Sequence, residues 1–224
     1  MLNIVIGYDR TNRLPAYTLT DSILEHTSKP VSFTYLHRET IPQLIRPVGP
    51  HDSTEFSISR FMVPSLFDYT GWTLFLDNDM IVQDDISELF DLADPQYAVM
   101  CVKHNQVCKS SKKFLGKEQV QYQYKNWSSV MLFNNSKCVG LSQHYVNTAP
   151  GLDLHQFKWL AGEHMIGELP LEWNYLVGNE NQTTKRPKLI HYTEGGPFFE
   201  EYKRCEYNEQ WFDTYERIND VRSV

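Results

Sequence analysis

The chain has 224 residues and a formal net charge of -7, and 41% of its residues are hydrophobic, which is enough for a sizeable core. The acidic balance and the lack of a dense Lys/Arg block argue against nucleic-acid binding. No stretch approaches the roughly 18 apolar residues that span a bilayer, the N-terminal sequence is unlike a secretory signal, and the four cysteines lack C-x-x-C spacing. We therefore expect a soluble cytoplasmic protein with free thiols, folded as one domain over residues 1–224.

The first half of the chain predicts strands that alternate with helices. Short apolar or alternating runs predict strands at residues 2–6, 31–36 and 72–76, and an amphipathic pattern beginning at Pro15 predicts a helix that ends near residue 28. Residues 38–50 carry three prolines and are expected to form a loop. Helical spacing recurs between residues 58 and 67, where Pro64 conflicts with a continuous helix.

The second half is less regular but continues the same pattern. Strands are predicted at residues 97–102, 130–133 and 188–190, and a helix at residues 154–160. Strands and helices in this order predict an α/β, Rossmann-like fold with a mostly parallel central sheet flanked by helices. Ligands of such sheets bind beyond the carboxyl ends of the strands, which places Gly7-Tyr8-Asp9 and Asp77-Asn78-Asp79 at the same edge.

Asp77-Asn78-Asp79 is the sharpest chemical feature of the sequence. The apolar strand ending at Leu76 delivers two carboxylates separated by one residue. Such close carboxylates repel each other unless a cation lies between them, and hard divalent ions prefer oxygen ligands. The alternative is a polar turn in which Asp79 caps the segment that follows.

The context of this D-x-D motif resembles GT-A glycosyltransferases of the glycogenin and lipopolysaccharide-galactosyltransferase type. In that family the motif is followed by I-V and then D-(I/L)-x-E-L, as in Ile81-Val82 and Asp85-Ile86-Ser87-Glu88-Leu89 here. Further landmarks keep the family's order: R-(L/F)-x-(I/V)-P at 60–64, S-S-V-M-L-x-N at 128–134 (similar to the family's S-G-V-M-L-x-N), L-P-x-x-W-N at 169–174 and H-x-x-x-G at 191–195. The series covers almost the whole chain.

The resemblance implies a metal-dependent glycosyltransferase that uses a UDP-sugar donor and an oligosaccharide or glycoprotein acceptor. It implies that Asp77, Asp79 and His191 bind Mn²⁺ (or Mg²⁺), since two carboxylates and an imidazole suit such an ion. It also assigns Gly7, Tyr8, Asp9, Arg60, Asp77 and Asn78 to the nucleotide site. Neither nucleic acid nor a membrane span is expected.

The sequence departs from the family at the expected sugar site. His155-Gln156-Phe157 stands where the family has D-Q-D, Trp127 replaces an asparagine before Ser128, and the terminal lysine is missing. The proposed sugar-binding residues are Arg60, Trp127, Ser128, His155, Gln156 and Phe157. Apolar side chains in place of carboxylates favour a less polar sugar such as the 6-deoxy sugar rhamnose, so UDP-rhamnose is the expected donor, with UDP-glucose as the runner-up.

These departures also bear on stereochemistry. Glycogenin-like enzymes retain anomeric configuration, whereas an inverting enzyme needs a base beside the acceptor hydroxyl. The chain also resembles compact bacterial and viral glycosyltransferases, including the N-terminal domain of a chlorovirus rhamnosyltransferase, which favours inversion and a bacterial or infected-host cytosol. Asp213 is the favoured base and Glu163 the next, with Trp211 and Phe212 as sugar platforms; alternatively, these two rings pack a terminal helix.

Three other functions stay open at this point. One is a retaining hexosyltransferase of the glycogenin-like type, and another is a catalytically weak glycan-binding module. A nucleotidyltransferase also uses paired carboxylates, but it needs a Gly-rich phosphate loop after the first strand, which Gly7-Tyr8-Asp9-Arg10-Thr11 does not supply.

Overall fold

The computed structural model describes residues 1–49, 52–104, 124–179, 182, 184 and 186–220. Its main sheet has six strands in the order β2-β1-β3-β6-β5-β7. The strands are β1 (Leu2–Gly7), β2 (Val31–Leu36), β3 (Trp72–Leu76), β5 (Val99–Cys101), β6 (Val130–Asn134) and β7 (Ile166–Glu168). β1 runs parallel to β2 and β3, β5 runs parallel to β7, and β6 is antiparallel to both of its neighbours. The expected α/β fold with a mostly parallel sheet is confirmed.

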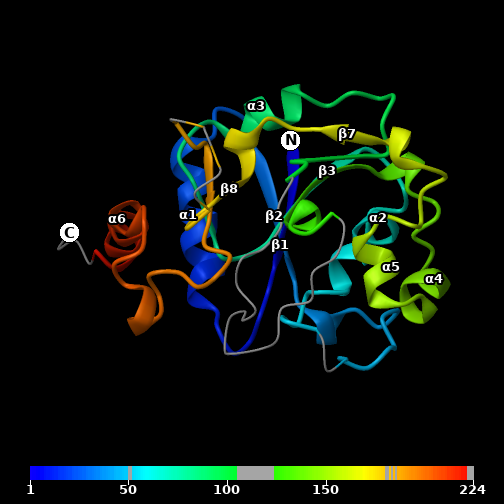
Figure 1. Cartoon of the computed structure of the whole chain (residues 1–224), viewed down its shortest axis with the longest axis horizontal. Helices are drawn as coiled ribbons and strands as arrows, with labels where there is room; N and C mark the ends of the chain where they lie inside the picture. The colour runs from blue at the N-terminus through cyan, green and yellow to red at the C-terminus, as the bar shows by residue number, and fades with distance from the viewer. Residues whose placement is uncertain (50–51, 105–123, 180–181, 183, 185, 221–224) are drawn as a thin grey trace.

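Both faces of this sheet are covered, which explains why its strands are almost continuously apolar. Side chains alternate between the faces, so Val5 and Phe75 pack into one cluster while Ile4 and Leu74 pack into another. Helix α1 (Leu14–His26) covers the second face with residues that include Leu19. The helices α2 (Val63–Leu66), α4 (Gln143–Thr148) and α5 (Gly151–His155) lie on the opposite side (Figure 1).

A smaller sheet of three strands, in the order β4-β9-β8, follows the D-x-D motif. Its strands are β4 (Met80–Val82), β8 (Tyr175–Leu176) and β9 (Leu189–His191). β4 and β9 are antiparallel, and their register sets Met80 opposite His191. Two segments more than a hundred residues apart in sequence are thereby brought together at the carboxyl end of β3.

Short helices complete the described chain. They are α3 (Ile86–Asp91), α6 (Asn208–Asn219) and the 3₁₀ helices η1 (Arg38–Thr40), η2 (Ser59–Met62), η4 (Trp127–Ser129), η5 (Asn135–Lys137), η6 (Glu163–Met165), η7 (Leu171–Asn174) and η8 (Glu200–Tyr202). Pro64 does not break a helix, because it lies in the first turn of α2, where its missing N–H has no partner to lose. The helix expected at 154–160 instead ends at His155, and Phe157 adopts a left-handed backbone with φ 57°.

Helix α6 packs on α1 at the outside of the molecule (Figure 1), where Arg217 forms an ion pair with Asp21. Trp211 is 2% exposed and packs with Ile81, Ile190 and Tyr192. The prediction that Trp211 is a sugar platform is therefore wrong, because its ring lies in a hydrophobic cluster. Phe212 is half-buried against the same cluster.

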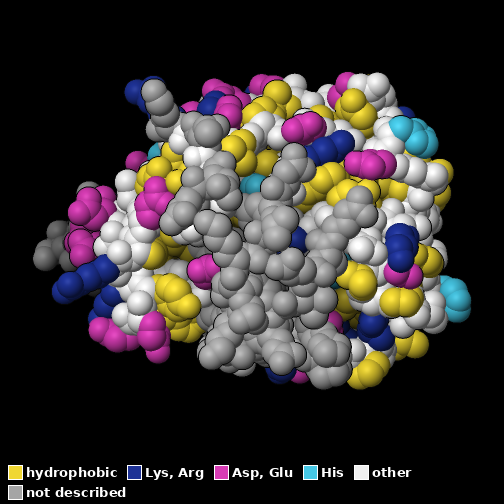
Figure 2. All heavy atoms as spheres, viewed as in Figure 1, with side chains coloured by type: hydrophobic (Ala, Val, Ile, Leu, Met, Phe, Trp, Pro, Cys, Tyr) yellow, Lys and Arg dark blue, Asp and Glu magenta, His cyan; other side chains and the backbone are white. Residues whose placement is uncertain are grey.

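The surface agrees with the acidic composition. On the face shown in Figure 2, Lys and Arg side chains are scattered among acidic ones and do not gather into one patch. Among the described residues, no helix combines the length and apolar character needed to cross a membrane. Cys101, Cys138 and Cys205 are free, and Cys108 lies outside the described residues.

Candidate metal and donor site

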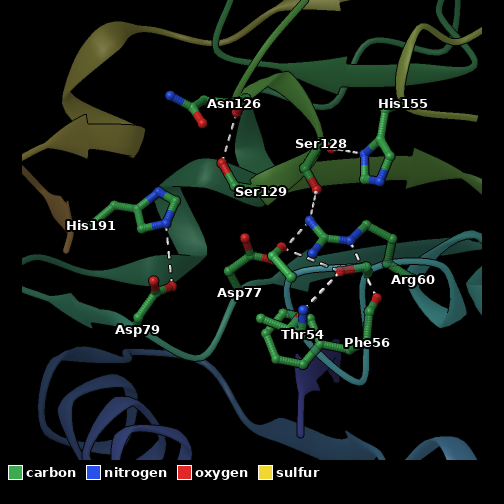
Figure 3. Close-up of polar contacts among 12 residues, drawn as sticks. Thr54, Phe56, Arg60, Asp77, Asp79, Asn126, Ser128, Ser129, His155 and His191 are labelled. Atoms are coloured by element: carbon green, nitrogen blue, oxygen red, sulfur yellow. Dashed lines mark hydrogen bonds and ion pairs between the residues drawn. The ribbon is translucent and has the colours of Figure 1, made fainter. Parts of the chain in front are cut away.

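Asp77, Asp79 and His191 meet at the carboxyl end of β3 (Figure 3). Asp77 follows β3 directly, and its N–H donates to the Ser129 carbonyl at 2.9 Å, which extends the pairing of β3 with β6 beyond the strand. Asp79 precedes β4, and its carbonyl accepts from the Tyr192 N–H at 2.9 Å. Strand pairing thus fixes the backbone around each of the three residues.

The three side chains form a compact set of ligands. Each offers one atom, and these atoms lie within 4.8 Å of one another. His191 Nε2 lies 3.2 Å from Asp79 Oδ1, and the His191 side chain is 3% exposed. Asp79 Oδ1 is shielded from solvent, and no described residue donates a hydrogen bond to it. Two carboxylates and an imidazole around a shared space fit a divalent cation.

Arg60 lies behind Asp77 as part of the same site. Its Nη1 lies 2.8 Å from Asp77 Oδ1 and also donates to the Ser128 carbonyl at 2.8 Å. The guanidinium lies against the rings of Phe56 and Phe75, at 5.4 and 5.0 Å from their centroids. The Arg60 side chain is 6% exposed, so this is a buried ion pair.

The residues expected to bind the nucleotide begin at the end of β1. A Cβ at Gly7 would come within 2.5 Å of the Phe56 ring, so packing alone already requires glycine there. Asp9 Oδ1 accepts from both the N–H and the hydroxyl of Thr11, at 2.9 and 2.6 Å. Tyr8 lies edge-on to His37, with ring centroids 5.5 Å apart.

Tyr8 also lies edge-on to Tyr35, and Asn78 is 6% exposed between the two aspartates. No sequence motif marks Phe56, Tyr35 or His37, because they come from segments outside the motifs. The nucleotide-binding role of this whole group stays a prediction.

The expected sugar-binding residues divide into two groups. Ser128 and His155 are in contact, with Oγ and Nδ1 2.8 Å apart, and Arg60 reaches the Ser128 carbonyl. Trp127 and Phe157 are 4% and 3% exposed and belong to the main hydrophobic cluster, with ring centroids 6.4 Å apart. Core packing therefore accounts for both rings without a sugar ligand. Gln156, which precedes Phe157 in sequence, is half-buried.

Neither expected base contacts the Asp77-Asp79-His191 cluster in the described structure. Asp213 is exposed on α6. Glu163 is also exposed and accepts a hydrogen bond from the Tyr124 hydroxyl at 3.2 Å. Their assignment as bases stays a prediction.

Sequence reasoning missed a set of polar residues behind the cluster. Asn174 is fully buried. Its Oδ1 lies 2.9 Å from His191 Nδ1, and its amide nitrogen donates to Ser129 Oγ. His104 is 7% exposed, and burial, reinforced by nearby His191, lowers its pKa to about 3, so its imidazole is neutral. Ser129 and Asn174 lay within the recognised patterns, but no signal distinguished their roles from packing.

Comparison with known proteins places this geometry in a family. Residues 22–197 match glycosyl transferase family 8. Protein CDI of Arabidopsis thaliana is 41% identical over 225 residues, which cover 96% of this chain and 86% of that protein.

Solved structures show the same fold at low identity. WbbM, a bifunctional glycosyltransferase, aligns with a TM-score of 0.68 and 18% identity over 95% of this chain, which spans about half of that protein (49%). LgtC, a galactosyltransferase solved with donor and acceptor sugar analogues, aligns with a TM-score of 0.67 and 13% identity, covering 99% of this chain and 98% of that one.

A glycosyltransferase involved in glycosylation of the major capsid of PBCV-1 aligns with a TM-score of 0.52 and 15% identity, covering 96% of this chain and 98% of that one. These likenesses confirm the expected resemblance to GT-A enzymes, viral ones included. By its match over residues 22–197, the chain belongs to glycosyl transferase family 8 and is a nucleotide-sugar-dependent glycosyltransferase.

Proposed function

We propose that this enzyme transfers a sugar from a UDP-sugar to a glycan acceptor, with Mn²⁺ or Mg²⁺ held by Asp77, Asp79 and His191. The observation that carries the proposal is the convergence of these three ligand atoms within 4.8 Å. A bound divalent cation would neutralise the charge that develops on the diphosphate as it leaves. The protein's own contribution is to hold the ligands in place before the donor arrives.

Arg60 supports this preorganisation through its buried contact with Asp77. Its contacts with Asp77 and the Ser128 carbonyl fix the carboxylate relative to the turn η4. Because the guanidinium is almost fully buried, we propose that Arg60 acts mainly by orienting Asp77 and touches the donor through at most its remaining exposed edge.

For the donor sugar we propose rhamnose or glucose. Support comes from residues 155–157, which supply no carboxylate for the hydroxyls of a more polar hexose. His155 is already engaged with Ser128, and Phe157 is committed to the core. Rhamnose, which has a methyl group in place of the 6-hydroxymethyl group, is accordingly expected to be a better donor than galactose, with glucose as the runner-up.

The stereochemical outcome depends on whether a carboxylate reaches the acceptor hydroxyl. Asp213 and Glu163 are both exposed, and neither contacts the ligand cluster in the described residues. Inversion requires one of them, or another carboxylate, to reach the acceptor hydroxyl, whereas retention, the glycogenin-like alternative, requires no such base. NMR of the product's anomeric proton distinguishes the two outcomes.

The proposal is tested by incubating the enzyme with UDP-rhamnose, UDP-glucose or UDP-galactose plus Mn²⁺ and measuring the release of UDP. We expect release with rhamnose or glucose, and its loss in Asp79→Ala. Asp91→Ala, which removes an exposed carboxylate on α3, serves as the control and should behave like the wild type. Equal turnover in Asp79→Ala and Asp91→Ala would exclude the proposed ligand role.

A further inference from the structure

A continuous chain of buried hydrogen bonds leads to His191 from behind. It begins at the carbonyl of Asn126, passes through the Ser129 hydroxyl and the Asn174 amide, and ends at His191 Nδ1. Ser129 and Asn174 are 3% and 0% exposed, so water does not compete for these bonds. Asn126, whose carbonyl is the first acceptor in this series of hydrogen bonds, adopts a left-handed backbone with φ 65° and precedes η4.

The direction of every bond in this chain follows from its first member. A backbone carbonyl only accepts, so the Ser129 hydroxyl, 2.7 Å away, must donate its hydrogen to Asn126. The Ser129 oxygen then presents a lone pair to Asn174 at 2.9 Å, and it is the Asn174 nitrogen that must lie there.

A second contact reinforces this amide orientation. The Asn174 nitrogen also lies 3.4 Å from the Asn126 carbonyl. A flipped amide would place two carbonyl-type oxygens against each other at this point and would face Ser129 Oγ with a second acceptor. Both contacts therefore select the same orientation.

Asn174 consequently presents its oxygen to His191, with Oδ1 and Nδ1 2.9 Å apart. An amide oxygen only accepts, so Nδ1 carries the ring hydrogen in the neutral imidazole. The other ring nitrogen, Nε2, is left with a lone pair that faces Asp79 Oδ1 at 3.2 Å. Two acceptors that face each other across this distance are favourable only when a cation or a proton lies between them.

We propose that Asn174 is a positioning residue that, together with Ser129 and the Asn126 carbonyl, holds neutral His191 in the Nδ1–H tautomer with Nε2 ready to ligate a metal. The tautomer assignment stands on these contacts alone, whereas its use in metal binding rests on the proposed function. Partners behind a metal-ligating histidine commonly act in this way.

The tautomer is measured directly by ¹⁵N NMR of histidine-labelled, metal-free protein in chelator, at an alkaline pH where the ¹⁵N shifts themselves show that the His191 ring is neutral. We expect the His191 ring of the wild type to show the Nδ1–H pattern. Asn174→Leu should shift it towards Nε2–H, because leucine accepts no hydrogen bond and Asp79 then offers the better acceptor. Asn174→Asp should restore Nδ1–H, since one carboxylate oxygen accepts in the same place and the Ser129 hydroxyl can rotate to donate to the other. A wild-type Nε2–H ring, or an unchanged ring in folded Asn174→Leu, overturns the proposal.

Ser129→Ala provides a milder variant if Asn174→Leu does not fold. It removes the hydroxyl that orients the amide, and we expect a mixture of tautomers; an unmixed Nδ1–H ring would remove Ser129 from the proposal.

Calorimetry with Mn²⁺ and saturating UDP gives the second readout. Asn174→Leu should weaken Mn²⁺ affinity roughly 10–100-fold, and Asn174→Asp should recover most of the loss. Equal affinity in wild type and Asn174→Leu contradicts the positioning role. If the wild type binds no Mn²⁺ yet shows the Nδ1–H ring, the proposed function fails and the assignment of the tautomer stands.

Discussion

The guanidinium of Arg60 is shielded from water and shared between Asp77 and two backbone carbonyls, of Phe56 and Ser128. Removing one member of a buried ion pair is costly because the remaining charge keeps its desolvation penalty. A surface ion pair costs little to break, because water replaces the lost partner. The two cases can be compared within this chain.

We predict that Arg60→Met lowers the free energy of unfolding by about 3–5 kcal/mol, measured by urea denaturation. The matched control is Arg10→Met, which removes a largely exposed partner of Glu39 and Glu55 and should cost no more than about 1 kcal/mol. If the two variants are equally stable, Arg60 does not stabilise the site and its role lies with the donor.

At the scale of an element, helix α3 begins at a carboxylate that is held ionised. Asp85 Oδ1 accepts from the Ser87 N–H at 2.9 Å and from the Ser28 N–H at 3.2 Å. Burial alone would raise the Asp85 pKa, but these hydrogen bonds outweigh it and lower the pKa to about 2. Because the folded value lies below the unfolded value of about 3.9, the stabilisation is present above pH ~4 and is lost as the pH falls towards ~2.

Asp85→Ala is therefore expected to lower the free energy of unfolding by about 1 kcal/mol at pH 7. The deficit should shrink when the same urea titration is repeated at pH ~3, because the wild type is then losing the same charge. Asp91→Ala, in the same helix but exposed, should show little deficit at either pH. A deficit in Asp85→Ala that does not change with pH would mean that packing, and not the charged cap, is responsible.

Helix α6 carries both Trp211, which the sequence analysis assigned to sugar binding, and Asp213, which it assigned as the base. Trp211 is buried and stacks on Tyr215, with ring centroids 5.4 Å apart and planes at 11°, whereas Asp213 is exposed on the same helix. If Asp213 is the predicted base, Asp213→Asn should lower turnover by about 10²-fold or more, whereas the retaining alternative, which needs no such base, predicts a change of less than about twofold. Steady-state release of UDP measures this. A hundredfold loss without a change in donor binding would identify Asp213 as the base.

The turn η4 is the element that joins the parts of the site. Its Ser129 carbonyl accepts from the Asp77 N–H, its Ser128 carbonyl accepts from Arg60, and the Ser129 hydroxyl accepts from Asn174. One short turn therefore contacts Asp77 itself and the residues that support two of the three proposed metal ligands, Arg60 for Asp77 and Asn174 for His191. A polar turn of this kind has no periodicity, so sequence patterns could mark it only as a family landmark.

At the scale of the whole molecule, the sheet was predictable and the site's surroundings were not. Strands such as β1 and β3 can be recognised in the sequence as apolar runs, because both of their faces are covered. The convergence of Asp77 and Asp79 with His191 followed from strand ends and the family's pattern. That the chain forms a single domain stays a prediction.

The wrong prediction for Trp211 has a physical cause. A single sequence does not distinguish an apolar ring that lines a ligand site from one that fills the core, which is why Trp211 was assigned to sugar. The sugar-binding role of Phe157 stays a prediction. Asn174 acts through hydrogen bonds to His191 and Ser129, which lie 17 and 45 positions away in sequence. Local sequence patterns cannot reveal contacts over such separations.

The most direct test of the metal site is calorimetric titration of UDP into the enzyme, with Mn²⁺ and with chelator, for wild type and Asp79→Ala. The proposed site predicts that UDP binds the wild type in Mn²⁺ and binds at least tenfold more weakly in chelator, a difference of about 1.4 kcal/mol in binding free energy. In Asp79→Ala, Mn²⁺ should not increase the affinity for UDP. UDP binding of equal affinity in Mn²⁺ and in chelator would contradict the metal site formed by Asp77, Asp79 and His191.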